Sequence, residues 1–308
     1  MSLLVIDKPS GPSSFAVVKR VRKLLARPRS EKIGHGGTLD PFASGVLPIC
    51  LGEGTKVLAF LLDADKAYEA VVRFGIETDT LDLTGQVVAE RSVAGLHAAA
   101  VEDALAAFRG AIEQVPPMFS ALKREGRPLY SYARAGQTVE REARSVTIHE
   151  LEIVGFDPPD RATLRLRCSK GTYVRSLAAD LGQRLQVGAH LVQLRRTASG
   201  PFRIEQAITL DDLETRVAQG QPLPVLTPLE ALAHLPRLVV DPAQALVLEH
   251  GQRMAWSDLS RGHTVVGPAC AVLEGDGPPS LVAVVAQNPD GNVKIVRGFR
   301  FRTSEGCS

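Results

Sequence analysis

The glycine-rich run of residues 34–48 is the segment best suited to chemistry, because its one acidic residue, Asp40, follows three glycines and precedes a proline. Glycines permit a sharp turn and the close approach of a ligand. Pro41 has a fixed φ and biases Asp40 towards an extended conformation. An aspartate held in this way can point its carboxylate into a cleft and act as a catalytic group. Asp-Pro is also a common start of a turn, and a lone histidine such as His35 is often only a hydrogen-bonded surface residue, so local chemistry leaves both roles open.

The motifs of the common cofactor-dependent and metal-dependent enzymes are missing from the sequence. Residues 52–56 have the composition of a phosphate-binding loop but the wrong spacing, and neither GxGxxG nor GxSxG occurs. The pair His149-Glu150 lacks the second histidine of a zinc-protease motif. If the chain is an enzyme, the sequence therefore predicts that its side chains act without a nucleotide cofactor and without a metal.

Several elements must position the glycine-rich loop, which we expect at residues 34–41. A buried strand is predicted at residues 3–7, followed by a helix that Ser13 or Ser14 caps. Strict alternation predicts a strand at residues 68–74. The remaining predictions for the first two thirds of the chain are helices at residues 15–25, 55–62, 101–108, 129–135 and 172–185, and strands at residues 146–156, 163–168 and 189–194.

The last third of the chain has a different pattern of predicted elements. Short helices are expected at residues 210–219 and 227–235, and short strands alternate with turns from residue 237 onwards. The last seven residues, 302–308, are expected to fray. A length of 308 residues with 44% hydrophobic and 23% charged residues suits one large or two ordinary globular domains. We therefore expect one domain at residues 1–236 and a β-rich domain at residues 237–308.

The cysteines and the N-terminus bear on the compartment. The four cysteines are widely spaced and form no CxxC pair, which excludes a zinc site built from neighbouring cysteines and does not suggest a disulfide framework. Free cysteines suit a reducing compartment, so we expect the protein in the cytoplasm. The apolar stretch at residues 3–6 is too short for a signal peptide or a membrane span, so we expect no membrane association.

Basic residues are concentrated in three segments, residues 19–32, 123–144 and 161–175. These segments hold 18 of the 36 basic residues and only four of the 34 acidic ones, although the net charge of the whole chain is only +2. Clustered base on a near-neutral chain is typical of a face that binds a polyanion. Solvated faces of helices and strands would give the same pattern, so charge alone does not decide between the two interpretations.

Several motifs, in order, make the sequence similar to a known family. The run of residues 34–48 resembles the catalytic motif of the bacterial tRNA pseudouridine(55) synthases, the TruB family. The other stretches that match this family are LVIDKPSG at residues 4–11, DKAY at residues 65–68, MFSALK at residues 118–123, CSKGTYVR at residues 168–175 and LRR at residues 194–196. The resemblance covers about residues 3–210 and continues weakly into the C-terminal domain.

The resemblance implies both a fold and a reaction. The fold is α+β, with a mixed, largely antiparallel sheet flanked by helices in the catalytic domain and a small PUA-like C-terminal domain. The reaction converts uridine to pseudouridine at position 55 in the TΨC loop of tRNA: the N1–C1′ bond breaks, the base turns over, and C5 bonds to C1′. This isomerisation exchanges no electrons and consumes no water, so no cofactor is expected. The expected partner is the T stem-loop of tRNA, bound by a monomer and gripped by an insertion near residues 115–145.

The resemblance also implies roles for individual residues. Asp40 is the nucleophile, which attacks C6 of the uracil or C1′ of the ribose or assists a glycal route. The resemblance places Arg175 against Asp40, and a guanidinium about 4–6 Å away would keep that carboxylate ionised. The target nucleotide must be flipped out of the folded RNA. The residues expected around it are Tyr68 stacked under the base, Tyr173 and Leu194 as pocket walls, and His35 as an RNA contact.

Other functions remain open from the sequence. The chain can be a non-catalytic tRNA-binding or folding helper, a related synthase that acts on ribosomal RNA or is guided by a small RNA, or a small-molecule enzyme built around the glycine-rich loop. Asp40 together with Arg175 and Tyr68 argues against the helper, and the insertion favours tRNA. The concentration of base argues against a small-molecule substrate. Without the resemblance, Arg175 would be interpreted as a surface charge on a helix, and Tyr68, Tyr173 and Leu194 as core residues.

Overall fold

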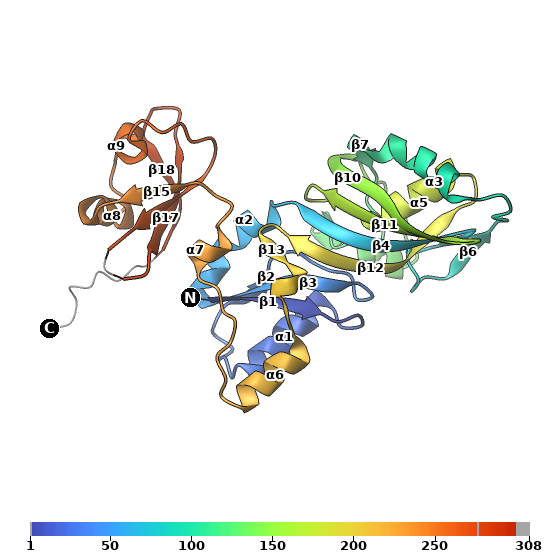
Figure 1. Ribbon diagram of the computed structural model, residues 1–308, viewed down its shortest axis with the longest axis horizontal. Coiled ribbons are helices and arrows are strands. Elements are labelled where there is room, and N and C mark those ends of the chain that lie inside the picture. Colours follow the sequence, from blue (N-terminus) through green and yellow to red (C-terminus); the bar gives the residue numbers. More distant parts are fainter. Residues whose placement is uncertain (1, 276, 300–308) are drawn as a thin grey trace.

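Two main β-sheets, two short two-stranded sheets and the helices packed on them make up the computed structural model, which describes residues 2–275 and 277–299 (Figure 1). The segment at residues 302–308, expected to fray, lies outside this part of the chain. Within the described residues the large sheet has ten strands. In spatial order its main path is β14 (Ile208–Thr209), β1 (Ser2–Lys8), β3 (Ser44–Leu51), β12 (Ala189–Ser199), β4 (Lys66–Phe74), β11 (Arg161–Cys168), β10 (Arg144–Asp157) and β7 (Gly110–Gln114), with β13 (Phe202–Arg203) on β12 and β2 (Ile33–His35) on β3.

The pairing within the large sheet is mostly antiparallel. Within the described part of this sheet, only β1 with β14 and β12 with β3 run parallel. β4 lies between β12 and β11 and shows the alternation expected from the sequence, with every second side chain buried. The mixed, largely antiparallel sheet of an α+β fold is thereby confirmed.

β1 is buried on both faces, which explains its unbroken run of apolar residues. Leu4 and Ile6 belong to the main core of the large sheet, whereas Leu3 and Val5 belong to a second core on the opposite face. A continuous apolar stretch without alternation is what a strand needs when no side of it meets water.

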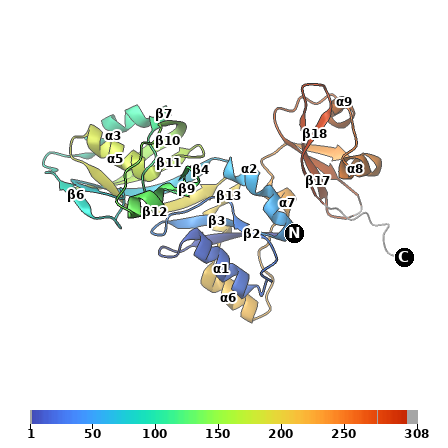
Figure 2. The same ribbon diagram turned by 180° about the vertical axis from the view of Figure 1, so that it is seen from behind.

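Helices pack against two parts of the large sheet. α1 (Ser14–Leu24) and α6 (Leu210–Ala218) pack side by side near the β1 end, whereas α5 (Val174–Arg184) packs on the central strands β12 and β4, and α3 (Ala98–Leu105) packs on β10 and against α5 (Figures 1 and 2). Ser13 caps α1 by accepting a hydrogen bond from the Ala16 N–H at 3.2 Å. The other elements of this region are η1 (Gly52–Val57), α2 (Leu58–Leu62), β5 (Ile76–Thr78), β6 (Val87–Glu90), η2 (Ala106–Phe108), β8 (Lys123–Arg124), β9 (Arg127–Pro128), α4 (Leu129–Arg134), η3 (Ile204–Gln206) and α7 (Pro228–Ala231).

The C-terminal region is built on the second sheet. Its strands lie in the order β15 (Arg237–Val240), β16 (Ala269–Leu273), β17 (Ser280–Gln287) and β18 (Val293–Gly298), and two helices, α8 (Pro242–Glu249) and α9 (Trp256–Ser260), complete it. The β-rich character is confirmed, but the two helices were not expected. The start of α8 could have been predicted from the sequence, because Asp241 and Gln244 form a capping box and Pro242 occupies the first helical position.

Two local predictions were wrong in detail. The loop predicted at residues 34–41 begins with residues of a strand, because Ile33–His35 pairs with β3 in antiparallel orientation. The predicted helix at residues 55–62 begins as the 3₁₀ segment η1 and becomes α-helical at Leu58. Short pairings of this kind depend on a partner strand and leave no periodic pattern of their own.

The C-terminal region shares a hydrophobic core with the large sheet. Leu3, Val5 and Val46 from the large sheet pack in one cluster with Val284 and Phe299 from the C-terminal region. Lys56 in η1 adds a polar contact, because its ammonium donates to the Gly298 carbonyl at 3.1 Å and lies 5.7 Å from the Phe299 ring centre. The two regions are therefore joined by apolar packing as well as by the chain.

The loop that follows β2 is held from two sides by buried polar groups. The Ser14 hydroxyl accepts a hydrogen bond from the Leu39 N–H at 2.8 Å and donates to the Leu39 carbonyl at 3.0 Å. The Lys8 ammonium at the end of β1 donates to the carbonyls of Pro41 at 3.1 Å and Ala43 at 2.6 Å. Burial lowers the pKa of Lys8 to about 8. A cation without water is tolerated there because backbone carbonyls replace its hydration.

The shared core gives a first prediction. Phe299→Ala should lower the free energy of unfolding by about 3–5 kcal/mol, because it leaves a cavity in packed apolar surroundings. Val266→Ala is the control, since the Val266 side chain is 89% exposed, and it should change stability by less than about 0.5 kcal/mol. Denaturant unfolding of both variants checks this. Equal stabilities would show that packing between the two regions contributes nothing.

Lys8 gives a second prediction. Its pKa is near 10.5 in the unfolded chain and about 8 when folded, so between these values the unfolded chain binds more protons. Stability from this group therefore rises with pH across that window, by at most about 1.4 kcal/mol per pH unit. The unfolding free energy of the wild type minus that of Lys8→Met should rise between pH 8 and pH 10.5 in urea titrations. Parallel profiles for the two proteins would contradict the burial of a charged Lys8.

Candidate active site

A cleft of about 350 Å³ opens beside the glycine-rich loop, between β4 and the N-terminus of α5. Five of the six residues expected at the site line it: Asp40, Tyr68, Tyr173, Arg175 and Leu194. They come from the loop, from β4, from the start of α5 and from β12, so residues far apart in sequence meet at one place. His35 is the exception and lies in a neighbouring cavity.

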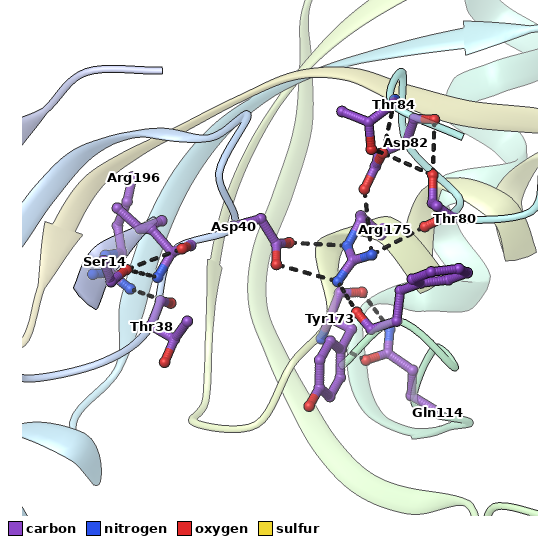
Figure 3. A network of polar contacts seen from close by, with 12 residues as sticks. Ser14, Thr38, Asp40, Thr80, Asp82, Thr84, Gln114, Tyr173, Arg175 and Arg196 are labelled. Carbon is purple, nitrogen blue, oxygen red and sulfur yellow. Dashed lines mark hydrogen bonds and ion pairs between the residues drawn. The ribbon is translucent and has the colours of Figure 1, made fainter. Parts of the chain in front are cut away.

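Arg175 lies between two carboxylates at the base of the cleft (Figure 3). Its Nε is 2.9 Å from Asp40 Oδ2 and its Nη2 is 3.3 Å from Asp40 Oδ1, a two-point contact that fixes the plane of the carboxylate. Its Nη1 is 3.3 Å from Asp82 Oδ2 and donates to the Thr80 carbonyl at 3.0 Å, and its Nη2 also donates to the Phe119 carbonyl at 2.8 Å. The guanidinium is therefore held by partners on all sides.

Asp82 is the main site residue that the sequence reasoning missed. It is buried, and its Oδ1 accepts hydrogen bonds from the Thr80 hydroxyl at 2.8 Å and from the Thr84 N–H at 2.9 Å. These bonds aim the other oxygen at Arg175. The run of threonine and aspartate at residues 78–84 was the available signal, but such a run in isolation indicates only a turn.

The backbone of the loop before Asp40 is fixed by Arg196 in β12. The Arg196 guanidinium donates to the carbonyls of Gly37 at 3.0 Å, Thr38 at 3.3 Å and Val46 at 2.8 Å. Strand β12 itself comes so close to β3 that a Cβ on Gly45 would lie 2.2 Å from the Arg196 carbonyl oxygen. Only glycine fits at this crossing.

Tyr173 is placed by a side chain from the edge strand β7. Gln114 donates from Nε2 to the Tyr173 carbonyl at 3.0 Å and accepts from the Tyr173 N–H at 2.7 Å. Tyr68 projects from the buried face of β4 and is a direct cross-strand partner of Arg196. The aromatic walls of the cleft are therefore fixed by the sheet.

Opposing effects act on the pKa of Asp40. Burial is the largest and raises the pKa, the Arg175 guanidinium lowers it, and the nearby Asp82 carboxylate raises it again, with a net shift upward. The Asp40 side chain nonetheless remains 33% exposed, against 4% for Arg175. A carboxylate that is aimed, more basic than usual and open to the cleft can act as a nucleophile or take up a proton.

His35 lines a second cavity, of about 490 Å³, which shares Asp40 and Arg175 with the first. Burial, followed by the positive charge of Arg196, lowers the pKa of His35 below its usual value. The imidazole is therefore neutral at pH 7.

The basic segments differ in how far their charge is compensated. On β11 and beyond it, Arg165 pairs with Glu152, Arg167 with Glu150 and Lys170 with Asp63, which reduces the positive field there. In segment 123–144, Arg141 instead donates to the Pro116 carbonyl at 3.0 Å. A cavity of about 360 Å³ in this segment is lined by Pro116, Leu122, Lys123, Arg124, Leu129, Glu140, Arg141, Glu142 and Arg144.

The described residues lack the features of two other classes of protein. They contain no group of three or more His, Cys, Asp or Glu side chains placed to hold a metal ion. They also contain no helix that is both long and apolar enough to cross a membrane.

Known proteins are similar to this chain in sequence and in fold. The model of the TruB family pseudouridylate synthase N-terminal domain matches residues 22–174, and that of the tRNA pseudouridylate synthase B C-terminal domain matches residues 175–234. The chain is 54% identical over 254 residues to tRNA pseudouridine synthase B of Pseudomonas aeruginosa (strain UCBPP-PA14), covering 81% of this chain and 82% of that one. It is 47% identical over 302 residues to tRNA pseudouridine synthase B of Cupriavidus pinatubonensis (strain JMP 134 / LMG 1197), covering 97% and 94%.

The structural likeness extends over nearly the whole chain. A solved structure of an H/ACA RNP bound to a substrate RNA containing 2′-deoxyuridine superposes with a TM-score of 0.73 at 26% identity, covering 98% of this chain and 86% of that one. Sequence, family models and fold thus agree with the geometry of the cleft. The chain belongs to the TruB family of tRNA pseudouridine synthases, the enzymes that isomerise uridine in tRNA.

Proposed function

We propose that this protein converts uridine to pseudouridine at position 55 in the TΨC loop of tRNA, with Asp40 as the nucleophile. The observation that carries the proposal is the two-point contact of Arg175 with Asp40 at the base of an open cleft. This contact aims the carboxylate towards the cleft and favours its charged form, although burial acts in the opposite direction.

The reaction places few demands on the protein beyond positioning. Asp40 attacks the flipped-out nucleotide at C6 or C1′, or assists loss of a ribose proton, and the N1–C1′ bond breaks. The uracil turns over, C5 bonds to C1′, and the bond to Asp40 breaks again or the ribose regains its proton. The hydrogen on C5 leaves as a proton, and N1 gains one. Atoms and electrons balance without any co-reactant. An aspartate held by a buried guanidinium meets these demands because it needs no reorganisation when the substrate arrives.

The remaining residues of the site hold the extruded nucleotide. Tyr68 stacks on the uracil, an interaction worth roughly 1–3 kcal/mol that accepts the base in either orientation. Tyr173 and Leu194 form walls of the pocket. The neutral His35 contacts the RNA beside the flipped nucleotide, from the neighbouring cavity that shares Asp40.

The uncompensated base of segment 123–144 grips the T stem-loop in this proposal, within an insertion near residues 115–145. Residues 1–236 form the catalytic domain and residues 237–308 a PUA-like domain. The protein acts as a monomer in the cytoplasm, where its tRNA substrate is. Recognition of a folded RNA relies on shape and phosphates more than on base edges.

Asp40→Asn should abolish isomerisation and leave tRNA affinity nearly unchanged. Asparagine is almost isosteric but is neither a nucleophile nor a base, whereas the affinity comes from basic faces and stacking. Tritium release from tRNA labelled at uracil C5, under single-turnover conditions, measures the reaction.

The control is Asp211→Asn, which removes an exposed carboxylate on α6 that pairs with Arg20. It should keep the wild-type rate. A folded Asp40→Asn variant that reacts at more than about a hundredth of the wild-type rate, a barrier difference of roughly 2.7 kcal/mol, would refute the assignment of the nucleophile.

Charge reversal tests the RNA grip. The double variant Arg141→Glu/Arg144→Glu should bind tRNA more weakly, and its affinity should depend less steeply on salt, by about 0.7–0.9 log units per log unit of salt for each phosphate that is no longer neutralised. Filter binding between about 50 and 200 mM salt measures the slope. Arg216→Glu on α6, outside the three basic segments, should leave the slope unchanged, and equal slopes in all proteins would exclude segment 123–144 from the RNA face.

A further inference from the structure

The cleft contains two buried basic side chains besides Arg175, the residue that pairs with the carboxylates of the site. Lys66 and Arg196 are both buried and both line the cleft. Among the described residues, no carboxylate forms an ion pair with either of them, whereas Arg175 is paired with both Asp40 and Asp82. Two cations of the site therefore have no carboxylate in contact among the described residues, although Asp63 and Asp65 act on Lys66 at longer range.

Backbone carbonyls are the hydrogen-bond partners of these two cations. The Lys66 ammonium donates to the carbonyls of Leu62 at 2.6 Å and Ala64 at 2.5 Å, and Arg196 donates to carbonyls of the glycine-rich loop and β3. Carbonyl dipoles replace the lost hydration but leave the net charge in place. Burial, followed by the charge of Arg196, lowers the pKa of Lys66 to about 8, although the carboxylates of Asp63 and Asp65 act in the opposite direction. The charge of Arg196 therefore reaches its neighbours in the cleft.

The sheet places both cations next to the expected position of the base. Lys66 lies two residues before Tyr68 on the same buried face of β4, and Arg196 is the cross-strand partner of Tyr68 on β12. Asp40 and Arg175 reach the same cleft from the loop and from α5, which packs on this face of β4. The cleft thus contains the Asp40 carboxylate together with two cations, Lys66 and Arg196, that flank Tyr68 in the sheet and form no ion pair among the described residues.

We propose that Lys66 and Arg196 stabilise the negative charge that the uracil ring acquires as the N1–C1′ bond breaks. This inference rests on the proposed function. The bond breaks with its electron pair on the base, and addition of Asp40 at C6 would likewise drive electrons onto the ring, so the need is the same for each route. Cations fixed before the reaction stabilise such charge without reorganisation. Arg196 has the additional positioning function of holding the loop that carries Asp40.

Substrates with different leaving groups separate charge stabilisation from a purely structural role. Fluorine at C5 withdraws electrons and stabilises the ring anion, so a 5-fluorouridine target should depend less on the cations. The experiment uses stem-loop RNAs with uridine or 5-fluorouridine at the target position, with saturating enzyme at pH 7, where Lys66 is protonated because its pKa is about 8. Loss of the starting nucleoside gives the rate; it is measured by chromatography coupled to mass spectrometry of nucleoside digests, because an isomer has the mass of its substrate, and a binding assay gives Kd.

Lys66→Met and Arg196→Met should each slow the uridine substrate about 100-fold, the effect of a unit charge roughly 6 Å away at an effective dielectric constant of about 20. The 5-fluorouridine substrate should slow at least several-fold less, with Kd nearly unchanged. Arg196→Lys, which keeps the charge, should recover most of the rate lost in Arg196→Met. The matched control is Arg195→Met, because Arg195 is neutralised by Asp7 at 2.8 Å and lies outside the cleft lining, and both substrates should react as in the wild type.

Equal slowing of both substrates, or an unchanged uridine rate in folded Lys66→Met, would overturn the inference. Lys66→Met and Arg196→Lys decide the question by themselves where Arg196→Met fails to fold. If the wild type converts uridine but the ratio of the uridine rate to the 5-fluorouridine rate is the same in the variants as in the wild type, this inference alone is refuted. A wild-type protein that converts no uridine refutes the proposed function itself.

Discussion

The ion pairs of Arg175 with Asp40 and Asp82 are the interaction on which the rest of the site depends. Only 4% of the Arg175 side chain is exposed, and a guanidinium so far from water is stable only with charged and polar partners on every side. Arg175 lies in α5, and the loop before β3, the segment at residues 78–84 and the Phe119 backbone all supply such partners. The arginine thereby joins four separate segments, and the position of Asp40 follows from theirs.

The same arrangement sets the chemistry of Asp40. Burial alone would favour a protonated, inert carboxyl group, and a second carboxylate at Asp82 adds to that effect. Arg175 opposes both, because it lies against Asp40 as well as Asp82. The carboxylate that results is fixed in orientation and more basic than an exposed aspartate. Such a group suits a reaction in which the substrate itself supplies every atom.

Basic side chains whose hydrogen-bond partners are backbone carbonyls retain their positive charge, whereas those paired with carboxylates are neutralised. On β11 the arginines are paired with glutamates of β10, and exposed pairs of this kind contribute little to binding or stability. Lys66 and Arg196 within the cleft, and Arg141 in segment 123–144, contact carbonyl groups. Local charge counts along the sequence cannot distinguish these cases, because the compensating acid often lies on a neighbouring strand.

The sequence by itself determined the parts of this protein whose cause is local. Alternation predicted β4, a serine cap predicted the start of α1, and glycine and proline predicted the constrained loop around Asp40. The ordered motifs predicted the family, and with it the fold and the residues of the cleft. Short pairings such as β2 and the role of Asp82 had no such local cause.

Only the tertiary structure decided which polar groups meet. The carbonyl that Arg196 Nη2 contacts lies 159 residues away in the chain, and Asp82 lies 93 residues from Arg175. Neither contact leaves a periodic or compositional trace, because each depends on how β12, α5 and the loops fold against one another. Burial then turns these residues from ordinary charges into the groups that fix Asp40, since a charge removed from water must find its partners within the protein.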